Sequence, residues 1–186
     1  EKYDLLADHL VIVDKSTQRI VGTYRLLCSA YTHEFYSQSE FQIDDFLKRP
    51  GTKLELSRAC IHRDYRKGLV MTLLWRGLVE YVREVGATYL FGCASVKTVQ
   101  PSEAKAVARL IEEKGSLCGD LRAKPHSSFL LPGFDDAEPS SGAQDLLPSL
   151  LGAYLRAGAK IASRPALDRA FRCVDFFTVL DMRELA

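Results

Sequence analysis

The sequence predicts a mixed α/β fold in which a mostly antiparallel, twisted sheet is flanked by helices. Runs rich in β-branched residues recur along the chain, and amphipathic helical patterns separate the later runs. The composition is that of an ordinary globular protein, with 47% hydrophobic and 26% charged residues among 186. This length suits one domain with its own core, so we expect a single domain over residues 1–186.

The first half of the chain reads as a hairpin followed by a third strand. Residues 9–14 and 19–28 are β-rich runs on either side of a short polar turn. Residues 29–51 are mixed and aromatic, which indicates a short helix or a loop. Residues 53–62 then form a strand.

A strand–helix–strand unit follows, and it should be parallel and right-handed. Apolar residues from Val70 to Val85 fall on one helical face, and Gly86 stands where a C-cap glycine belongs. Residues 88–95 are apolar on both faces, as in a central strand. Pro101 opens a second helix that stops near Gly115.

The last third predicts a loop, one helix and two strands. Residues 120–149 are rich in Pro, Ser, Gly, Asp and Ala, so we expect most of them to form an exposed loop. A short helix over residues 147–157 and strands over 159–163 and 173–182 close the chain.

Composition also limits the function. The net charge of +1 argues against a nucleic-acid partner. The 5 cysteines form no CxxC pair, and with only four histidines neither a disulfide framework nor a metal site is expected in what reads as a cytoplasmic protein. No apolar run approaches the roughly 20 residues that span a bilayer. Because the chain begins with Glu-Lys-Tyr-Asp, we expect an N-terminal part of the domain to be absent.

The stretch LELSRACIHRDYRKGLV, residues 54–70, places charged groups in an apolar strand. Alternation assigns Arg58, with Cys60, to one face and Glu55, with small neighbours such as Ser57, to the other. A lone buried carboxylate costs several kcal/mol unless it is paired or hydrated. Glu55 is therefore either a site carboxylate or a buried residue satisfied by a neighbour such as Arg25.

The basic turn that follows is a second candidate site. Arg63, Arg66 and Lys67 stand beside the free backbone N–H groups of a helix start, an arrangement that suits phosphate. The alternative is a solvated turn. There is no Walker motif and no GxGxxG, so neither ATP nor dinucleotide binding is supported.

An ordered set of motifs resembles the GNAT acyltransferase superfamily. VGTYRLL and LELSRAC resemble the G-x-x-R-L and E-x-S-R motifs of the acyl-homoserine-lactone synthases. The sequence is more similar still to the acyl-carrier-protein-dependent N-acyltransferases that make lyso-ornithine lipid and other N-acyl amino acids. The runs that carry this closer resemblance are DHLVIVD, VGTYRLL, ELSRACIHRDYR, LLWRGLVEYV, LFGCAS, LLGAYLRAGAKI and RPALDRAFRCVDFFTVLDM.

The resemblance implies where the acyl donor binds. In such folds an acyl thioester lies in a splay between two strands, which here are residues 54–62 and 88–95. The residues implied for the donor are Cys60, Ile61, His62, Arg63, Arg66, Lys67 and Gly68. The turn has one glycine where CoA-binding members have R/Q-x-x-G-x-G/A. This departure favours a phosphopantetheine thioester on an acidic acyl carrier protein over acyl-CoA, with no permanently bound cofactor.

The resemblance also implies the reaction. A long-chain acyl group, with a 3-hydroxyacyl group as a variant, passes to the amino group of an amino acid, with L-ornithine as the acceptor that the closer resemblance favours. Glu55 is implied as the base, Arg25 and Arg58 as ligands of the acceptor, and Asp4, Asp8 and Asp175 as partners of a second cationic group. Because the product is a lipid, peripheral contact with the inner face of the membrane is compatible with this interpretation.

Four alternatives stay open at the level of sequence. The chain could be a small-acyl GNAT that uses acetyl-CoA, or an acyl-homoserine-lactone synthase with S-adenosylmethionine as acceptor. It could be an inactive module that binds a carrier protein or a membrane surface. Finally, acyl transfer could pass through a covalent intermediate on Cys28, Cys60 or Cys93.

Overall fold

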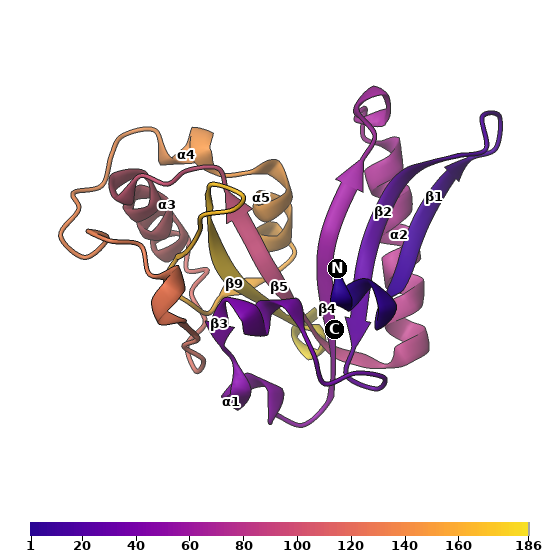
Figure 1. The fold of residues 1–186 in the computed structure, drawn as a ribbon, viewed down its shortest axis with the longest axis horizontal. Helices are drawn as coiled ribbons and strands as arrows, with labels where there is room; N and C mark the ends of the chain where they lie inside the picture. The colour runs from indigo at the N-terminus through magenta and orange to yellow at the C-terminus, as the bar shows by residue number, and fades with distance from the viewer. Residues whose placement is uncertain (186) are drawn as a thin grey trace. The chain divides into compact units, whose positions relative to one another are not determined.

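A computed structural model describes residues 1–185, which group into two compact units (Figure 1). The first unit contains Glu1–Tyr36 and Pro50–Leu90, and the second contains Ser37–Arg49 and Phe91–Ala186. The chain therefore crosses between the units after Tyr36, Arg49 and Leu90.

The first unit is a sheet with one long helix. Its strand order is β1-β2-β4-β5, and both β1–β2 and β2–β4 are antiparallel. The elements are η1 (Lys2–Leu5), β1 (Asp8–Asp14), β2 (Arg19–Cys28), β4 (Thr52–Ile61), η3 (Arg63–Tyr65), α2 (Leu69–Val85) and the start of β5 (Ala87–Val96). The predicted hairpin, third strand and first helix are confirmed.

Helix α2 covers one face of this sheet (Figure 1). A methyl group added to Gly22 of β2 would lie 2.5 Å from a methyl carbon of Val70, so a residue without a side chain permits this close approach. On β1, Leu10 packs against Gly77 of the same helix. The helix ends as the sequence predicts, on Gly86 in the left-handed conformation with φ 62°.

Strand β4 contains a bulge that the sequence does not predict. Arg25 of β2 is paired with Ser57, whereas Thr23 is paired with Cys60, so β4 has one extra residue between these pairs. Arg58 lies inside this interval with φ 52°, in the left-handed region. Strict alternation of faces along residues 54–62 is therefore wrong beyond Ser57.

The bulge changes which side chains share a face. Directly paired residues of neighbouring strands project to the same side of a sheet. Cys60, paired with Thr23, therefore lies on the face of Glu55 and Ser57, the face opposite α2. Ile61 is paired with Gly22, which places it on the α2 side.

The second unit has a sheet of order β5-β9-β7, with β8 also paired to β9, and a separate antiparallel pair of β3 with β6. The strands are β3 (Phe41–Gln42), the end of β5, β6 (Lys124–Pro125), β7 (Lys160–Ile161), β8 (Ala166–Asp168) and β9 (Cys173–Asp181). The helices are η2 (Tyr36–Ser39), α1 (Asp44–Leu47), α3 (Pro101–Glu113), η4 (Ser127–Phe129), α4 (Ala143–Leu146), α5 (Ser149–Arg156) and η5 (Met182–Leu185).

The predicted exposed loop over residues 120–149 is wrong in part. Leu131 and Phe134 belong to the hydrophobic core of the second unit, together with Val107 and Ile111 of α3. Burial of these apolar side chains holds the segment against α3, although its composition is typical of a loop. Strands β3, β6 and β8 were not predicted, because each has only two or three residues and no periodicity to detect.

Candidate functional site

Glu55 is the buried carboxylate on which the site is built. Its exposed fraction is 0%, and its register partner on β2 is Leu27. The backbone N–H of Tyr36 donates a hydrogen bond of 2.7 Å to Oε2 of Glu55. This donor compensates part of the cost of removing the carboxylate from water.

Arg25 is a buried guanidinium on the same face of the sheet. Its exposed fraction is 1%. Its Nε donates to Oγ of Ser57 at 3.0 Å, and its Nη1 donates to the carboxylates of Glu1 at 2.6 Å and Asp4 at 2.9 Å. Arg25 thus donates its hydrogen bonds to Ser57 and to two acidic residues at the start of the chain, whereas Glu55 accepts a hydrogen bond from the Tyr36 amide.

Arg58 reaches the same face because of the bulge. Its guanidinium donates to the Glu1 carboxylate that also accepts from Arg25. Its Cζ atom lies 4.8 Å from the centroid of the Tyr36 ring, and Cζ of Arg25 lies 5.8 Å from that centroid. The hydrogen bond from Arg58, followed by that from Arg25, holds the pKa of Glu1 below its ordinary value.

We call this group, formed by Glu1, Asp4, Arg25, Tyr36, Glu55, Ser57 and Arg58, the Glu55 cluster. The sequence interpretation singled out Glu55, Arg25, Arg58 and Asp4 for it. It missed Tyr36, because the contribution of that residue to Glu55 is a backbone amide, which no side-chain pattern reveals. Ser57 was noted only as a small neighbour, although it stands inside the E-x-S-R motif and accepts from Arg25.

The structure does not bring Asp8 into the Glu55 cluster. Asp8 is paired with Leu26 and projects to the α2 side, where it accepts a hydrogen bond from the Tyr81 hydroxyl. Asp175 belongs to the second unit and lies in a different group of buried acids.

The residues expected to bind the donor gather where β4 ends and α2 begins. Nε of Arg66 donates to the carbonyl of Ile61 at 3.0 Å, and the His62 ring accepts from the Asp64 amide. Arg63, Arg66 and Lys67 are exposed. Gly68 is the N-cap of α2 with φ 98°, and no side chain caps the amides of the first turn. The turn thus presents cations and free backbone donors together.

The second unit contains a buried acidic group around Asp175. Ligand-type atoms of Asp168, Cys173 and Asp175 all lie within 4.8 Å of one another, and Oγ of Ser95 donates to Asp175 at 2.5 Å. A metal ion is one species that such a set could hold. Burial is the main reason that the pKa of Asp175 is raised and that the pKa of the Cys173 thiol rises to about 12. A protonated thiol is a poor ligand and a poor nucleophile.

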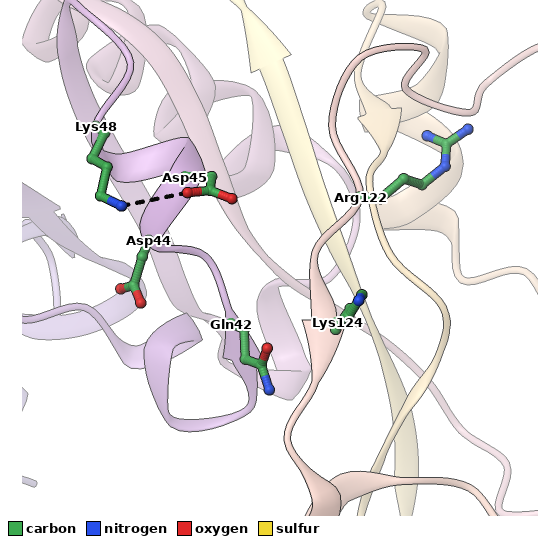
Figure 2. A pocket seen from close by; sticks show the side chains of 6 residues that line it. All are labelled: Gln42, Asp44, Asp45, Lys48, Arg122 and Lys124. Carbon is green, nitrogen blue, oxygen red and sulfur yellow. Dashed lines mark hydrogen bonds and ion pairs between the residues drawn. The ribbon is translucent and has the colours of Figure 1, made fainter.

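A separate surface cavity of about 260 Å³ lies in the second unit (Figure 2). It is lined by Gln42, Asp44, Asp45, Lys48, Arg122 and Lys124. Lys48 and Asp45 form an ion pair of 3.5 Å at its edge. The lining includes none of the predicted site residues, and its mixed charges give no indication of one ligand class.

Within residues 1–185, no helix combines the length and the apolar character that crossing a membrane requires.

Comparison with known proteins first defines the class. The model of the acetyltransferase (GNAT) domain matches residues 1–76, which include the whole Glu55 cluster. A solved CoA-dependent acyl-homoserine lactone synthase, in complex with SAM and isopentyl-CoA, shares the fold. Its TM-score is 0.52 at 14% identity, with 100% of this chain and 64% of that chain covered. The chain thus has a GNAT fold.

Sequence relatives then identify the family. The L-ornithine N(alpha)-acyltransferase of Agrobacterium fabrum (strain C58) is 34% identical, over 100% of this chain and 68% of its own length. The enzyme of the same name from Rhizobium meliloti (strain 1021) is 32% identical, over 100% of this chain and 67% of its own length. The chain belongs to the L-ornithine N(alpha)-acyltransferase family.

Proposed function

We propose that this chain transfers a long-chain acyl group, including 3-hydroxyacyl groups, from the phosphopantetheine thioester of an acyl carrier protein to the α-amino group of L-ornithine. The observation that carries the proposal is the Glu55 cluster. It combines a buried carboxylate with two guanidinium groups on one face of the first unit, in a chain whose relatives are named for this acceptor.

The reaction requires a base, because an amino acid presents its amine largely as ammonium. Glu55 accepts a proton from this group, directly or through one water. The free amine attacks the thioester carbonyl, an N–C bond forms, and the C–S bond breaks as the carrier thiolate leaves. The second proton that the nitrogen loses on becoming an amide ends on this thiolate. The Tyr36 amide fixes the orientation of the Glu55 carboxylate during these steps.

The oxyanion of the tetrahedral intermediate needs hydrogen-bond donors. Between the pairs Arg25–Ser57 and Thr23–Cys60, β4 has one residue more than β2, so the regular pattern of backbone hydrogen bonds is interrupted there. Backbone N–H groups of β4 are therefore our candidates for this role.

Charge at the turn before α2 supports the carrier-protein donor. Arg63, Arg66 and Lys67 attract an acidic carrier and its single phosphate. One glycine, Gly68, gives the backbone less freedom to surround the pyrophosphate of CoA.

Asp4 is our candidate for holding the side-chain ammonium of the acceptor. We also propose that the thioester is held in a splay between strands. A peripheral contact with the membrane, through which the lipid product is delivered, is a further part of the proposal.

Replacement of Glu55 by glutamine tests the assignment of the base. The change keeps the size and hydrogen-bonding capacity of the side chain but removes its basicity. We expect kcat for acylation of ornithine to fall by about 10²–10⁴-fold, the usual contribution of a general base. Binding of the acyl carrier protein donor should be retained, and mass spectrometry of the product gives head group and chain length together.

Glu80→Gln provides the matched control, because Glu80 lies on the exposed surface of α2 beside Arg76. It should behave as the wild type. Full activity of a folded Glu55→Gln protein would show that Glu55 is not the base. Activity with acyl-CoA but not with the acyl carrier protein would overturn the proposed donor.

A further inference from the structure

We infer that Nη2 of Arg25 binds the α-carboxylate of the acceptor and thereby selects the α-amino group, and not the side-chain amine, for acylation. This inference rests on the proposed function and specifies how the site recognises and orients the acceptor amino acid.

The hydrogen bonds of Arg25 leave one end of its guanidinium without a partner. Nε donates a hydrogen bond to Ser57, and Nη1 donates to the carboxylates of Glu1 and Asp4. Nη2 is buried and has no hydrogen-bond partner among the described residues. Water cannot readily take the place of that partner, because Arg25 is only 1% exposed. A buried charged donor that is left unsatisfied destabilises the protein, so this atom points to an anionic ligand.

Two aromatic rings lie next to this guanidinium. Its Cζ atom lies 5.4 Å from the centroid of the Tyr3 ring and 5.8 Å from that of Tyr36. Such cation–π contacts do not use the N–H groups of the guanidinium, which stay available for hydrogen bonds, and a carboxylate is the acceptor that these groups match. A second guanidinium, that of Arg58, contacts the Tyr36 ring and the Glu1 carboxylate and adds positive charge to the same group of residues.

The register of β2 and β4 connects this anchor to the base. Arg25 is paired with Ser57 and Leu27 with Glu55, so Arg25 and Glu55 are diagonal neighbours on one face. Diagonal positions in an antiparallel pair are separated by about 7–8 Å. An amino acid whose carboxylate binds Arg25 carries its α-amine on the adjacent carbon, within reach of Glu55. The side-chain amine of ornithine is three carbons farther along and is displaced from the base.

The wild-type enzyme supplies the first test. Ornithine is compared with ornithine amide and with 1,4-diaminobutane, which is ornithine without its carboxylate. We expect ornithine to be acylated only on its α-amine, as fragmentation in mass spectrometry reports. The kcat/KM for either analogue should be at least about 10-fold lower, because each leaves Nη2 without a charged partner.

The second test uses Arg25→Lys, which keeps the charge but loses the forked donor, with Arg76→Gln on the exposed face of α2 as control. We expect the KM for ornithine to rise by about 10-fold or more, the KM for the acyl donor to stay unchanged, and some product to carry its acyl group on the side-chain amine. The control should match the wild type. Circular dichroism checks that the variant is folded, and the analogue comparison does not depend on that variant.

Equal use of ornithine and 1,4-diaminobutane by the wild type would overturn the role of Arg25 while leaving acylation of ornithine intact. An unchanged KM for ornithine together with α-acylation alone in a folded Arg25→Lys protein would overturn it as well. Failure of the wild type to acylate ornithine with any donor would instead refute the proposed function, and this inference with it.

Discussion

At the scale of single residues, charged side chains in apolar strands were the most informative feature of the sequence. Glu55 and Arg25 were identifiable because a carboxylate or guanidinium in a strand interior needs a partner or a function. Their partners were not identifiable. The Tyr36 amide reaches Glu55 from a segment 19 residues away that has no periodic pattern, and Glu1 and Asp4 reach Arg25 across 24 and 21 residues.

The cysteines lead to a prediction about the covalent alternative. Cys60 is exposed, whereas Cys28 and Cys173 are buried, and burial raises the pKa of both buried thiols. A thiol reagent at roughly pH 8 should therefore label Cys60 first and leave Cys28 and Cys173 unlabelled until the protein unfolds. Cys60→Ser should remove the fast phase, as absorbance of the released reagent measures.

The three thiols of the covalent alternative, Cys28, Cys60 and Cys93, should not become acylated. Intact-protein mass spectrometry after mixing with the acyl donor alone should find no acyl adduct, because direct attack by the acceptor amine needs no enzyme thioester. An adduct on Cys28, Cys60 or Cys93 that ornithine then discharges would establish the covalent route.

At the scale of elements, the long periodic segments were predictable and the irregular ones were not. Helix α2 and its C-cap follow from apolar spacing and Gly86, and both hairpin strands follow from their β-rich composition. The bulge at Arg58 could not be predicted, because an arginine at φ 52° has no sequence signal comparable to glycine. Yet this bulge brings Arg58 to the face of Glu55, which strict alternation assigned to the opposite side.

Gly22 allows a prediction about the contact between β2 and α2. Gly22→Ala places a methyl group 2.5 Å from Val70 and 3.2 Å from Leu74, so the helix must shift or repack. We expect the free energy of unfolding to fall by about 1–3 kcal/mol, the typical cost of overpacking a core. Urea unfolding followed by fluorescence of Trp75, the single tryptophan, which lies on α2, measures it.

Gly119→Ala is the control for this substitution, because a methyl group there has no atom within 4 Å and the backbone has no positive φ. It should unfold within about 0.5 kcal/mol of the wild type. If the two alanine variants unfold at the same urea concentration, the close approach of α2 to Gly22 does not explain the glycine of the G-x-x-R-L motif.

At the scale of the whole molecule, charge is nearly balanced but unevenly distributed. The chain has 25 basic and 24 acidic residues, so its net charge of +1 gives no general attraction to an acidic partner. The turn between β4 and α2 differs, because Arg63, Arg66 and Lys67 are exposed there with Asp64 as the only acid among residues 62–68. Any preference for an acidic carrier protein must therefore come from a local surface, and local electrostatic attraction is sensitive to salt.

Salt dependence separates the two candidate donors. With the acyl carrier protein, kcat/KM should fall by about 10-fold or more between about 0.05 M and about 0.5 M NaCl, because screening shortens the range of the attraction. Replacement of Arg63, Arg66 and Lys67 by glutamine should lower kcat/KM at low salt and flatten this dependence. Replacement of Lys97, Arg109 and Lys114, three exposed cations of the second unit, removes the same charge and should leave the slope unchanged. Equal slopes for both triple variants would show that the carrier does not dock at the turn before α2, and the single glycine at that turn would then need another explanation.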